Sequence, residues 1–186
     1  NPLSLAISFL VMSVLLTRVM TEESYGIYNV AMYYLQIFVL LALMGQDTSL
    51  MRFIPQYTVQ GQWGFIKGII SKSIKNSQIV AISLTIILAG LVYLLSPRLG
   101  PEKTLTFFVT LPLIPILSLT GIRESSLRSL KRVVYAYTPD SIIRPLVLGV
   151  LALIILAWTR YSITAPLLMG LSIAAVLCST FIGSFW

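Results

Sequence analysis

The sequence is poor in the residues from which most active sites are built. It contains no histidine, which is the most common proton shuttle and metal ligand. Its single cysteine, Cys178, lies in an apolar run and cannot form an internal disulfide. Only 10% of the 186 residues are charged and only 6 are acidic, whereas about 25% charged residues are usual in soluble domains.

Apolar residues take the place of the missing charges. They make up 57% of the chain, and the mean hydropathy is +0.91. Because a core of this size cannot hide so much apolar surface from water, we expect an all-α integral membrane protein. Soluble enzymes, nucleic-acid-binding proteins and secreted disulfide scaffolds are excluded. A crossing helix needs about 20 apolar residues, so the length allows roughly six or seven crossings.

Six charge-free stretches are apolar enough to cross the bilayer. A seventh, residues 53–66, is too rich in glutamine, glycine and proline to enter lipid. The predicted transmembrane helices cover residues 2–18, 25–45, 78–96, 104–122, 141–158 and 165–186. Together they predict a six-helix bundle that forms one lobe over residues 1–186.

The basic residues predict the orientation of these helices. Nine of the 13 fall in the connectors after the second and fourth helices, and the positive-inside rule places these connectors in the cytoplasm. We therefore expect a multi-pass protein of the plasma membrane with a cytoplasmic N-terminus. The net charge of +7 then reflects loop orientation rather than a nucleic-acid partner.

The connector over residues 47–77 is predicted to be an amphipathic cytoplasmic segment. Lysines occupy a different face from the apolar residues that recur at helical spacing, which are Ile66, Ile69, Ile70 and Ile74. This pattern suits a basic helix in the headgroup layer. The simpler alternative is a solvated extension whose lysines only set the topology.

Proline predicts where the helices break. Residues 97–101 contain Pro-x-x-Gly-Pro and predict a tight turn. Pro112 and Pro115 predict a kink in the fourth helix, a feature that is typical of transporters but also occurs in inert bundles. Thr138 and Pro139 resemble an N-cap followed by proline at the first position of the fifth helix.

A polar stripe on the second helix is the main candidate for a binding surface. Its members share one face because they are four, four and three residues apart: Tyr25, Asn29, Tyr33 and Gln36. Gln46 and Asp47 close the cytoplasmic end of this helix. One hypothesis is that the stripe lines a path for a polar ligand such as a sugar; the alternative is that it binds the second helix to its neighbours.

Three arginines lie at the ends of predicted helices, Arg18 at the outer interface and Arg52 and Arg144 at the cytoplasmic one. The planar guanidinium group binds phosphate oxygens through two hydrogen bonds. Arginines at helix ends also commonly reach to the interface without any further role. Both interpretations stay open for each of the three.

Other patterns predict structure rather than chemistry. Ala175, Ser179 and Gly183 recur every four residues and predict close helix packing. No acidic residue lies deep within a predicted helix, and no nucleophile–base pair or metal-binding cluster is evident. We therefore expect no enzymatic activity, no cofactor and no metal.

Three stretches of sequence resemble a known family. They are Leu16-Thr17-Arg18 with Tyr25-Gly26-Ile27-Tyr28, Ser49-Leu50-Met51-Arg52-Phe53, and Ile142-Ile143-Arg144-Pro145-Leu146. This pattern resembles polysaccharide biosynthesis membrane proteins, the oligosaccharide flippases of the MATE-like (multidrug/oligosaccharidyl-lipid/polysaccharide exporter) superfamily. The multidrug branch often relies on an acidic residue in its first helix, which this sequence lacks.

The resemblance implies the N-terminal lobe of a transporter with 12 or 14 helices. The sequence has no initiating Met and stops within an apolar run, as expected for a piece of a longer protein whose C-terminal lobe is the partner. Such proteins move polyprenyl pyrophosphate-linked oligosaccharides across the bilayer by alternating access. Arg18 and Arg52 match basic positions that could meet the pyrophosphate.

Two alternatives to a flippase follow from the same residues. A multidrug or small-molecule exporter of the same fold would have an apolar, aromatic path and a buried carboxylate. A non-transporting membrane scaffold would pack its polar stripes against other helices. Under each interpretation the lipid bilayer is a partner and nucleic acid is not.

Overall fold

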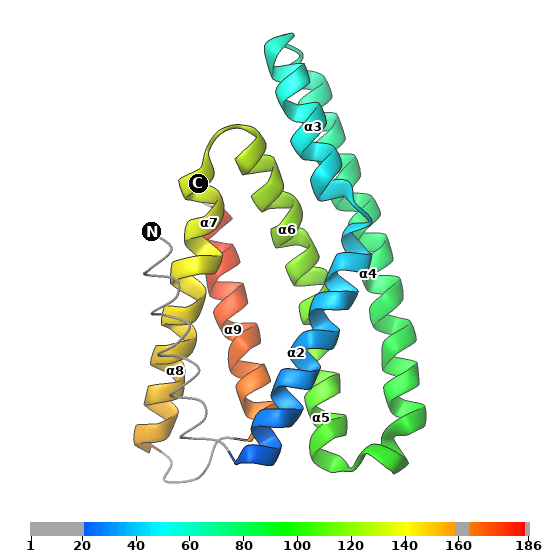
Figure 1. Ribbon diagram of the computed structural model, residues 1–186, viewed down its shortest axis with the longest axis vertical. Helices are drawn as coiled ribbons and strands as arrows, with labels where there is room; N and C mark the ends of the chain where they lie inside the picture. Colours follow the sequence, from blue (N-terminus) through cyan, green and yellow to red (C-terminus); the bar gives the residue numbers. More distant parts are fainter. Residues whose placement is uncertain (1–20, 159–163, 185–186) are drawn as a thin grey trace.

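The computed structural model describes residues 21–158 and 164–184, and every regular element in these ranges is a helix (Figure 1). The elements are α2 (Glu22–Leu43), α3 (Gln46–Val59), α4 (Trp63–Leu99), α5 (Pro101–Thr110), α6 (Leu113–Ser129), α7 (Val133–Thr138), a π-helical turn η1 (Pro139–Ile143), α8 (Arg144–Trp158) and α9 (Ala165–Ser184). The predicted first helix, residues 2–18, lies outside the described residues.

The apolar helices confirm a multi-pass membrane protein. Four described stretches are long and apolar enough to cross a bilayer: Glu22–Leu43, Trp63–Leu99, Pro101–Ser129 and Ala165–Gly183. They overlap four of the six predicted helices. α8 overlaps a fifth but has only 15 residues, which is shorter than the usual length of a crossing helix. The number of six crossings therefore stays a prediction.

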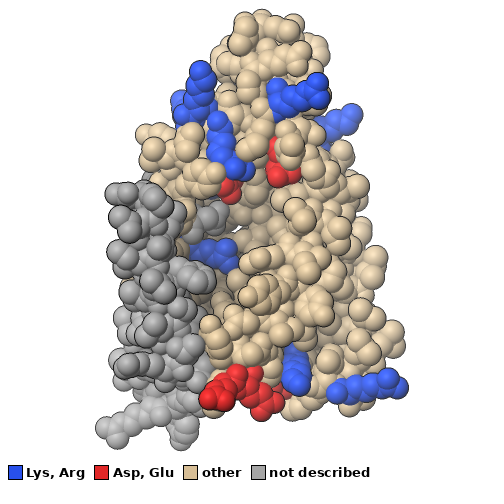
Figure 2. Space-filling view, viewed as in Figure 1, with Lys and Arg blue, Asp and Glu red and all other residues tan. Residues whose placement is uncertain are grey.

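The two ends of the bundle carry different charged residues (Figure 2). We call them the Glu102 end, where α2 and α5 begin, and the Lys72 end, where α2 continues into α3. α3 and the first part of α4 extend beyond the other helices at the Lys72 end (Figure 1).

The α3–α4 hairpin corrects the prediction for residues 47–77. Its faces are as expected, because Ile66 is buried with Leu50 and Ile54 while the lysines are exposed. The predicted start of the next helix at residue 78 is wrong, because the basic segment is the first part of α4, as the alternative of a helix extension expects. Its place in the headgroup layer stays a prediction. α4 is continuous over 37 residues, or about 55 Å, since its first proline is Pro97 in the last turn.

The proline break in the fourth predicted helix is confirmed. α5 ends at Thr110 and α6 begins at Leu113, with Pro112 in the turn between them. The amide of Gln78 in α4 donates hydrogen bonds to the Pro115 carbonyl at 2.9 Å and to the Ser118 hydroxyl at 3.1 Å. A neighbouring helix therefore binds polar groups beside the break, as broken helices inside a membrane require.

The prediction of an N-cap at Thr138 is wrong. Thr138 has helical backbone angles, and its hydroxyl donates to the Val134 carbonyl at 2.6 Å. The helix does not begin here: α7, η1 and α8 follow one another without a gap from Val133 to Trp158. Pro139 lacks the N–H that an α-helical hydrogen bond needs, and the π-helical turn begins at this residue.

The packing role predicted for α9 agrees with the structure. Ala175, Ser179 and Gly183 are all buried. The Arg123 guanidinium of α6 donates a hydrogen bond to the Gly183 carbonyl. A small residue at position 183 lets α6 place this long side chain against the α9 backbone.

Candidate functional site

The polar stripe of α2 lies beside the buried face of the helix. The buried face contains Ala31 and Leu35, which are almost inaccessible. Tyr25 and Asn29 are half-buried, whereas Tyr33 is 66% exposed and Gln36 is also exposed. Half of the stripe is therefore not buried against the helices that the structure describes.

One polar side chain of the stripe, Asn29, already makes a hydrogen bond within the protein. The Asn29 amide donates a hydrogen bond to the Tyr25 carbonyl at 2.9 Å, one turn earlier in the same helix. Such a bond uses one of the two amide donors and leaves the amide oxygen as an acceptor. From Tyr25 to Gln36 the stripe extends about 16 Å along the helix.

The structure adds Tyr28 to this face, a residue that the sequence did not single out. Tyr28 is buried next to the stripe, and its hydroxyl is hydrogen-bonded to the Ser172 side chain of α9. The Ser172 hydroxyl donates its only hydrogen to the Leu168 carbonyl at 3.0 Å. The Tyr28 and Ser172 side chains therefore link α2 to α9 beside the Leu168 carbonyl.

Arg144 supplies positive charge to this cluster. Its guanidinium is close enough to Tyr28 to interact electrostatically. Tyr28 lies six residues from the start of α2 at the Glu102 end, or about 9 Å along the helix. Arg144 is the first residue of α8. Its predicted place at the cytoplasmic interface stays a prediction.

The other predicted site residues lie apart from this cluster. Gln46 and Asp47 are half-buried in the first turn of α3. Arg52 is exposed on α3, where its guanidinium lies 5.8 Å from the centre of the Phe53 ring. Arg18 lies outside the described residues. No structural observation tests the predicted roles of these residues.

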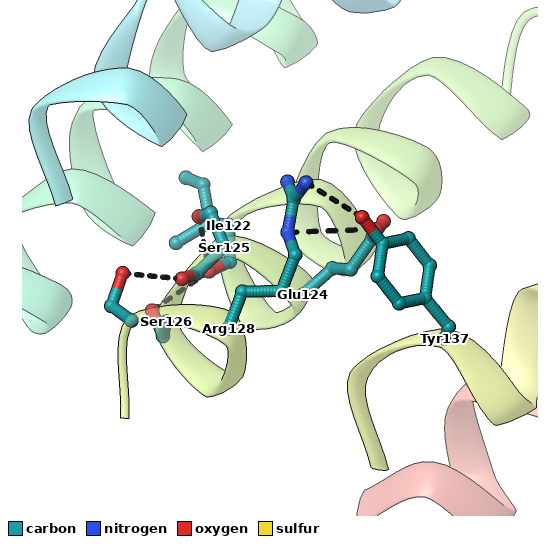
Figure 3. A network of polar contacts seen from close by, with 7 residues as sticks. Ile122, Glu124, Ser125, Ser126, Arg128 and Tyr137 are labelled. Atoms are coloured by element: carbon teal, nitrogen blue, oxygen red, sulfur yellow. Dashed lines mark hydrogen bonds and ion pairs between the residues drawn. The ribbon is translucent and has the colours of Figure 1, made fainter. Parts of the chain in front are cut away.

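Polar contacts fasten the two ends of the lobe around the cluster. At the Glu102 end, the Glu102 carboxylate accepts hydrogen bonds from the Ser24 hydroxyl at 2.6 Å and the Ala165 N–H at 3.4 Å. At the other end, Arg128 donates to the Tyr137 hydroxyl at 3.0 Å and pairs with Glu124 at 3.7 Å (Figure 3). The Glu102 contacts join α2, α5 and α9, and the Arg128 contact joins α6 to α7.

The cluster is suited to binding rather than to covalent chemistry. It contains the guanidinium group of Arg144, the hydroxyl group of Tyr28 and the side-chain amide of Asn29. Such groups can bind an anionic or hydroxyl-rich ligand. Within the described ranges, no three histidine, cysteine or acidic side chains lie together as a metal site would need.

Comparisons with known proteins identify the family. The model of the polysaccharide biosynthesis protein family matches residues 4–186. No curated protein and no solved structure matches the chain at a significant level. Since the match covers nearly the whole sequence and the helices are those of a membrane protein, the chain belongs to the polysaccharide biosynthesis protein family.

Proposed function

We propose that the protein is a flippase that moves a lipid-linked oligosaccharide across the membrane by alternating access, with this chain as its six-helix N-terminal lobe. No covalent step is involved. The task is to shield a polar headgroup from hydrocarbon while the lipid tail remains in the bilayer. The polar residues of α2 would contact the sugar, and basic residues would bind the pyrophosphate.

The observation that carries this proposal is the family match over residues 4–186 in a chain of apolar membrane helices. Arg144 adds support, because its charge is close enough to the buried Tyr28 to interact electrostatically. Charged groups at membrane depth are costly and are usually retained for a substrate or ion pathway. A pyrophosphate would offer negative charge to Arg144, and sugar hydroxyls suit the Asn29 amide and the exposed Gln36.

The exporter alternative draws support from an apolar cavity elsewhere in the lobe. Its volume is about 270 Å³, and its walls include the rings of Tyr34, Phe38 and Phe107. A path for cationic drugs would also need a carboxylate, and none lines this cavity. The scaffold alternative is less well supported, because Tyr33 and Gln36 are exposed rather than packed between helices.

Binding to the full-length protein in nanodiscs distinguishes these functions. We expect a polyprenyl pyrophosphate sugar to bind at least about tenfold more tightly than a lipophilic cation, which corresponds to about 1.4 kcal/mol. Arg18→Ala, Arg52→Ala and Arg144→Gln should each weaken binding of the pyrophosphate lipid. The flippase proposal fails if the cation binds more tightly, or if all three variants bind the lipid as well as the unaltered protein.

A further inference from the structure

The apolar cavity described above is a groove between α2, α4 and α5. Its wall on α4 runs from Leu88 to Leu99, and the opposite wall contains Leu35, Phe38 and Phe107. Thr110 also lines the groove, but its hydroxyl donates to the Thr106 carbonyl at 2.7 Å. The groove therefore offers an almost wholly apolar surface, and it lies outside the Tyr28–Arg144 cluster.

The length and position of the groove match the chain of one lipid leaflet. Leu88 and Leu99 are separated by 11 residues, or about 16 Å of helix. The hydrocarbon core of a bilayer is about 30 Å thick, so one leaflet contributes about 15 Å. The groove lies along the last third of α4 and ends at the Gly100 turn, where the headgroup layer is expected.

Two basic residues lie at the Glu102 end of the groove, on the same helix faces as residues of α4 and α5 that line it. Arg98 follows Leu91 and Leu95 at spacings of seven and three residues, and Lys103 precedes Phe107 by four. Both side chains are exposed, and neither has an ion pair within the described ranges. Figure 2 shows positive charge at the lower end of the molecule, where α4 and α5 meet.

The acidic residues at this end do not neutralise both cations. Glu102 is engaged by the Ser24 hydroxyl and the Ala165 N–H. Glu22 and Glu23 lie in the first turn of α2, where carboxylates interact favourably with the helix dipole. Arg98 and Lys103 are thus available to a phosphate at the mouth of the groove.

From this arrangement we propose that the groove binds one chain of a bilayer phospholipid whose phosphate is held by Arg98 and Lys103. A phospholipid presents an apolar chain of one leaflet's length directly below a phosphate. The groove and the two cations present the complementary features in the same order along α4. A bound phospholipid would seal the contact between α2, α4 and α5 on their membrane side.

Photo-crosslinking in nanodiscs tests this proposal with two neighbouring positions of α4. Benzoylphenylalanine replaces Leu91, which lines the groove, or Leu94, which is 75% exposed and does not line it. The full-length protein is placed in nanodiscs of phosphatidylethanolamine and phosphatidylglycerol with added polyprenyl phosphate. We expect phospholipid adducts at Leu91, reduced at least threefold by Arg98→Gln with Lys103→Gln, and adducts at Leu94 that these substitutions leave unchanged.

A second pair of substitutions controls for net charge. Lys67→Gln with Lys72→Gln removes two exposed charges at the opposite end of α4 and should leave the Leu91 adduct unchanged. The proposal is overturned if the Leu91 yield does not depend on Arg98 and Lys103, or if both pairs of substitutions lower it equally. It is also overturned if the Leu91 adduct carries polyprenyl phosphate instead of phospholipid.

Discussion

Among single residues, the Tyr28 hydroxyl has the most closely defined environment. It interacts with the Ser172 side chain, which is itself bonded to the Leu168 carbonyl, and with the charge of Arg144. A buried hydroxyl within such a polar network helps to fix the positions of its neighbours. Tyr28 is therefore expected to position Arg144 as well as to join α2 to α9.

The bond between Tyr28 and Ser172 can be measured by a double-mutant cycle. We expect Tyr28→Phe and Ser172→Ala to show a coupling of about 0.6 kcal/mol, and at most about 1.7 kcal/mol, in the free energy of unfolding in mixed micelles. Ser172→Ala should destabilise the lobe more than Tyr28→Phe, because it leaves the buried Tyr28 hydroxyl without this partner, whereas Ser172 keeps its bond to Leu168. A coupling indistinguishable from zero would show that the two side chains do not interact.

The sequence predicted this site only in part. Spacing alone placed Tyr25, Asn29, Tyr33 and Gln36 on one face of a helix, as the structure has them. Tyr28 was missed because a tyrosine beside apolar residues looks like any core aromatic. Its significance depends on Ser172 and Arg144, which are more than 100 residues away along the chain. Contacts over such distances carry no local signal in the sequence.

Among the helices, the broken α5–α6 pair depends on a side chain from α4. Gln78→Ala removes the donor that binds the Pro115 carbonyl and the Ser118 hydroxyl. We expect a loss of about 0.5–1.5 kcal/mol in the free energy of unfolding, since the link to α4 is lost and the Pro115 carbonyl keeps only the Ser118 hydroxyl as a donor. The measurement is equilibrium unfolding in mixed micelles.

Ser83→Ala is the matched control on the same helix. The exposed Ser83 hydroxyl donates only to the Ile79 carbonyl of its own helix, so its removal should change stability by less than about 0.5 kcal/mol. Equal losses for the Gln78 and Ser83 variants would contradict the role assigned to Gln78.

The α3–α4 hairpin is held by aromatic contacts at its projecting end. The Tyr57 and Phe65 rings lie 5.7 Å apart, centre to centre, and are nearly parallel. Phe65→Ala should destabilise α3 by about 0.5–1.5 kcal/mol beyond the loss of apolar area. Hydrogen exchange of the α3 amides should then become several times faster.

Trp63→Ala provides the comparison for this experiment. Trp63 is 58% exposed at the start of α4 and belongs to no ring pair in the described part of the chain. Its removal should leave α3 exchange almost unchanged. If Trp63→Ala accelerates exchange as much as Phe65→Ala, the ring contact does not hold the hairpin.

Helix boundaries show which parts of the fold the sequence determines locally. Hydropathy located four crossing helices, and prolines located the α5–α6 break, because both effects act within a few residues. Hydropathy did not predict that α4 begins at residue 63, because the first part of this helix is polar and continues directly into the apolar part. It also failed at Thr138, since a Thr-Pro pair opens some helices but here lies within a continuous one.

Orientation is the first property to test for the molecule as a whole. The positive-inside rule predicts that the Lys72 end is cytoplasmic. In a Cys178→Ser background, we expect Lys72→Cys to react with a membrane-impermeant maleimide only in inside-out vesicles, and Lys103→Cys only in intact cells or right-side-out vesicles. The opposite pattern would invert the proposed topology and move the phospholipid groove to the cytoplasmic leaflet.

Translocation of a fluorescent lipid-linked oligosaccharide by the full-length protein in proteoliposomes tests the central claim most directly. Arg144→Gln should lower the rate at least about tenfold, a barrier increase of about 1.4 kcal/mol, while Arg144→Lys keeps the charge and should retain part of it. Lys72→Gln, which alters an exposed charge far from Tyr28, should transport normally. Unchanged translocation in Arg144→Gln, or no translocation by the unaltered protein, would contradict a lipid-linked sugar path through this lobe.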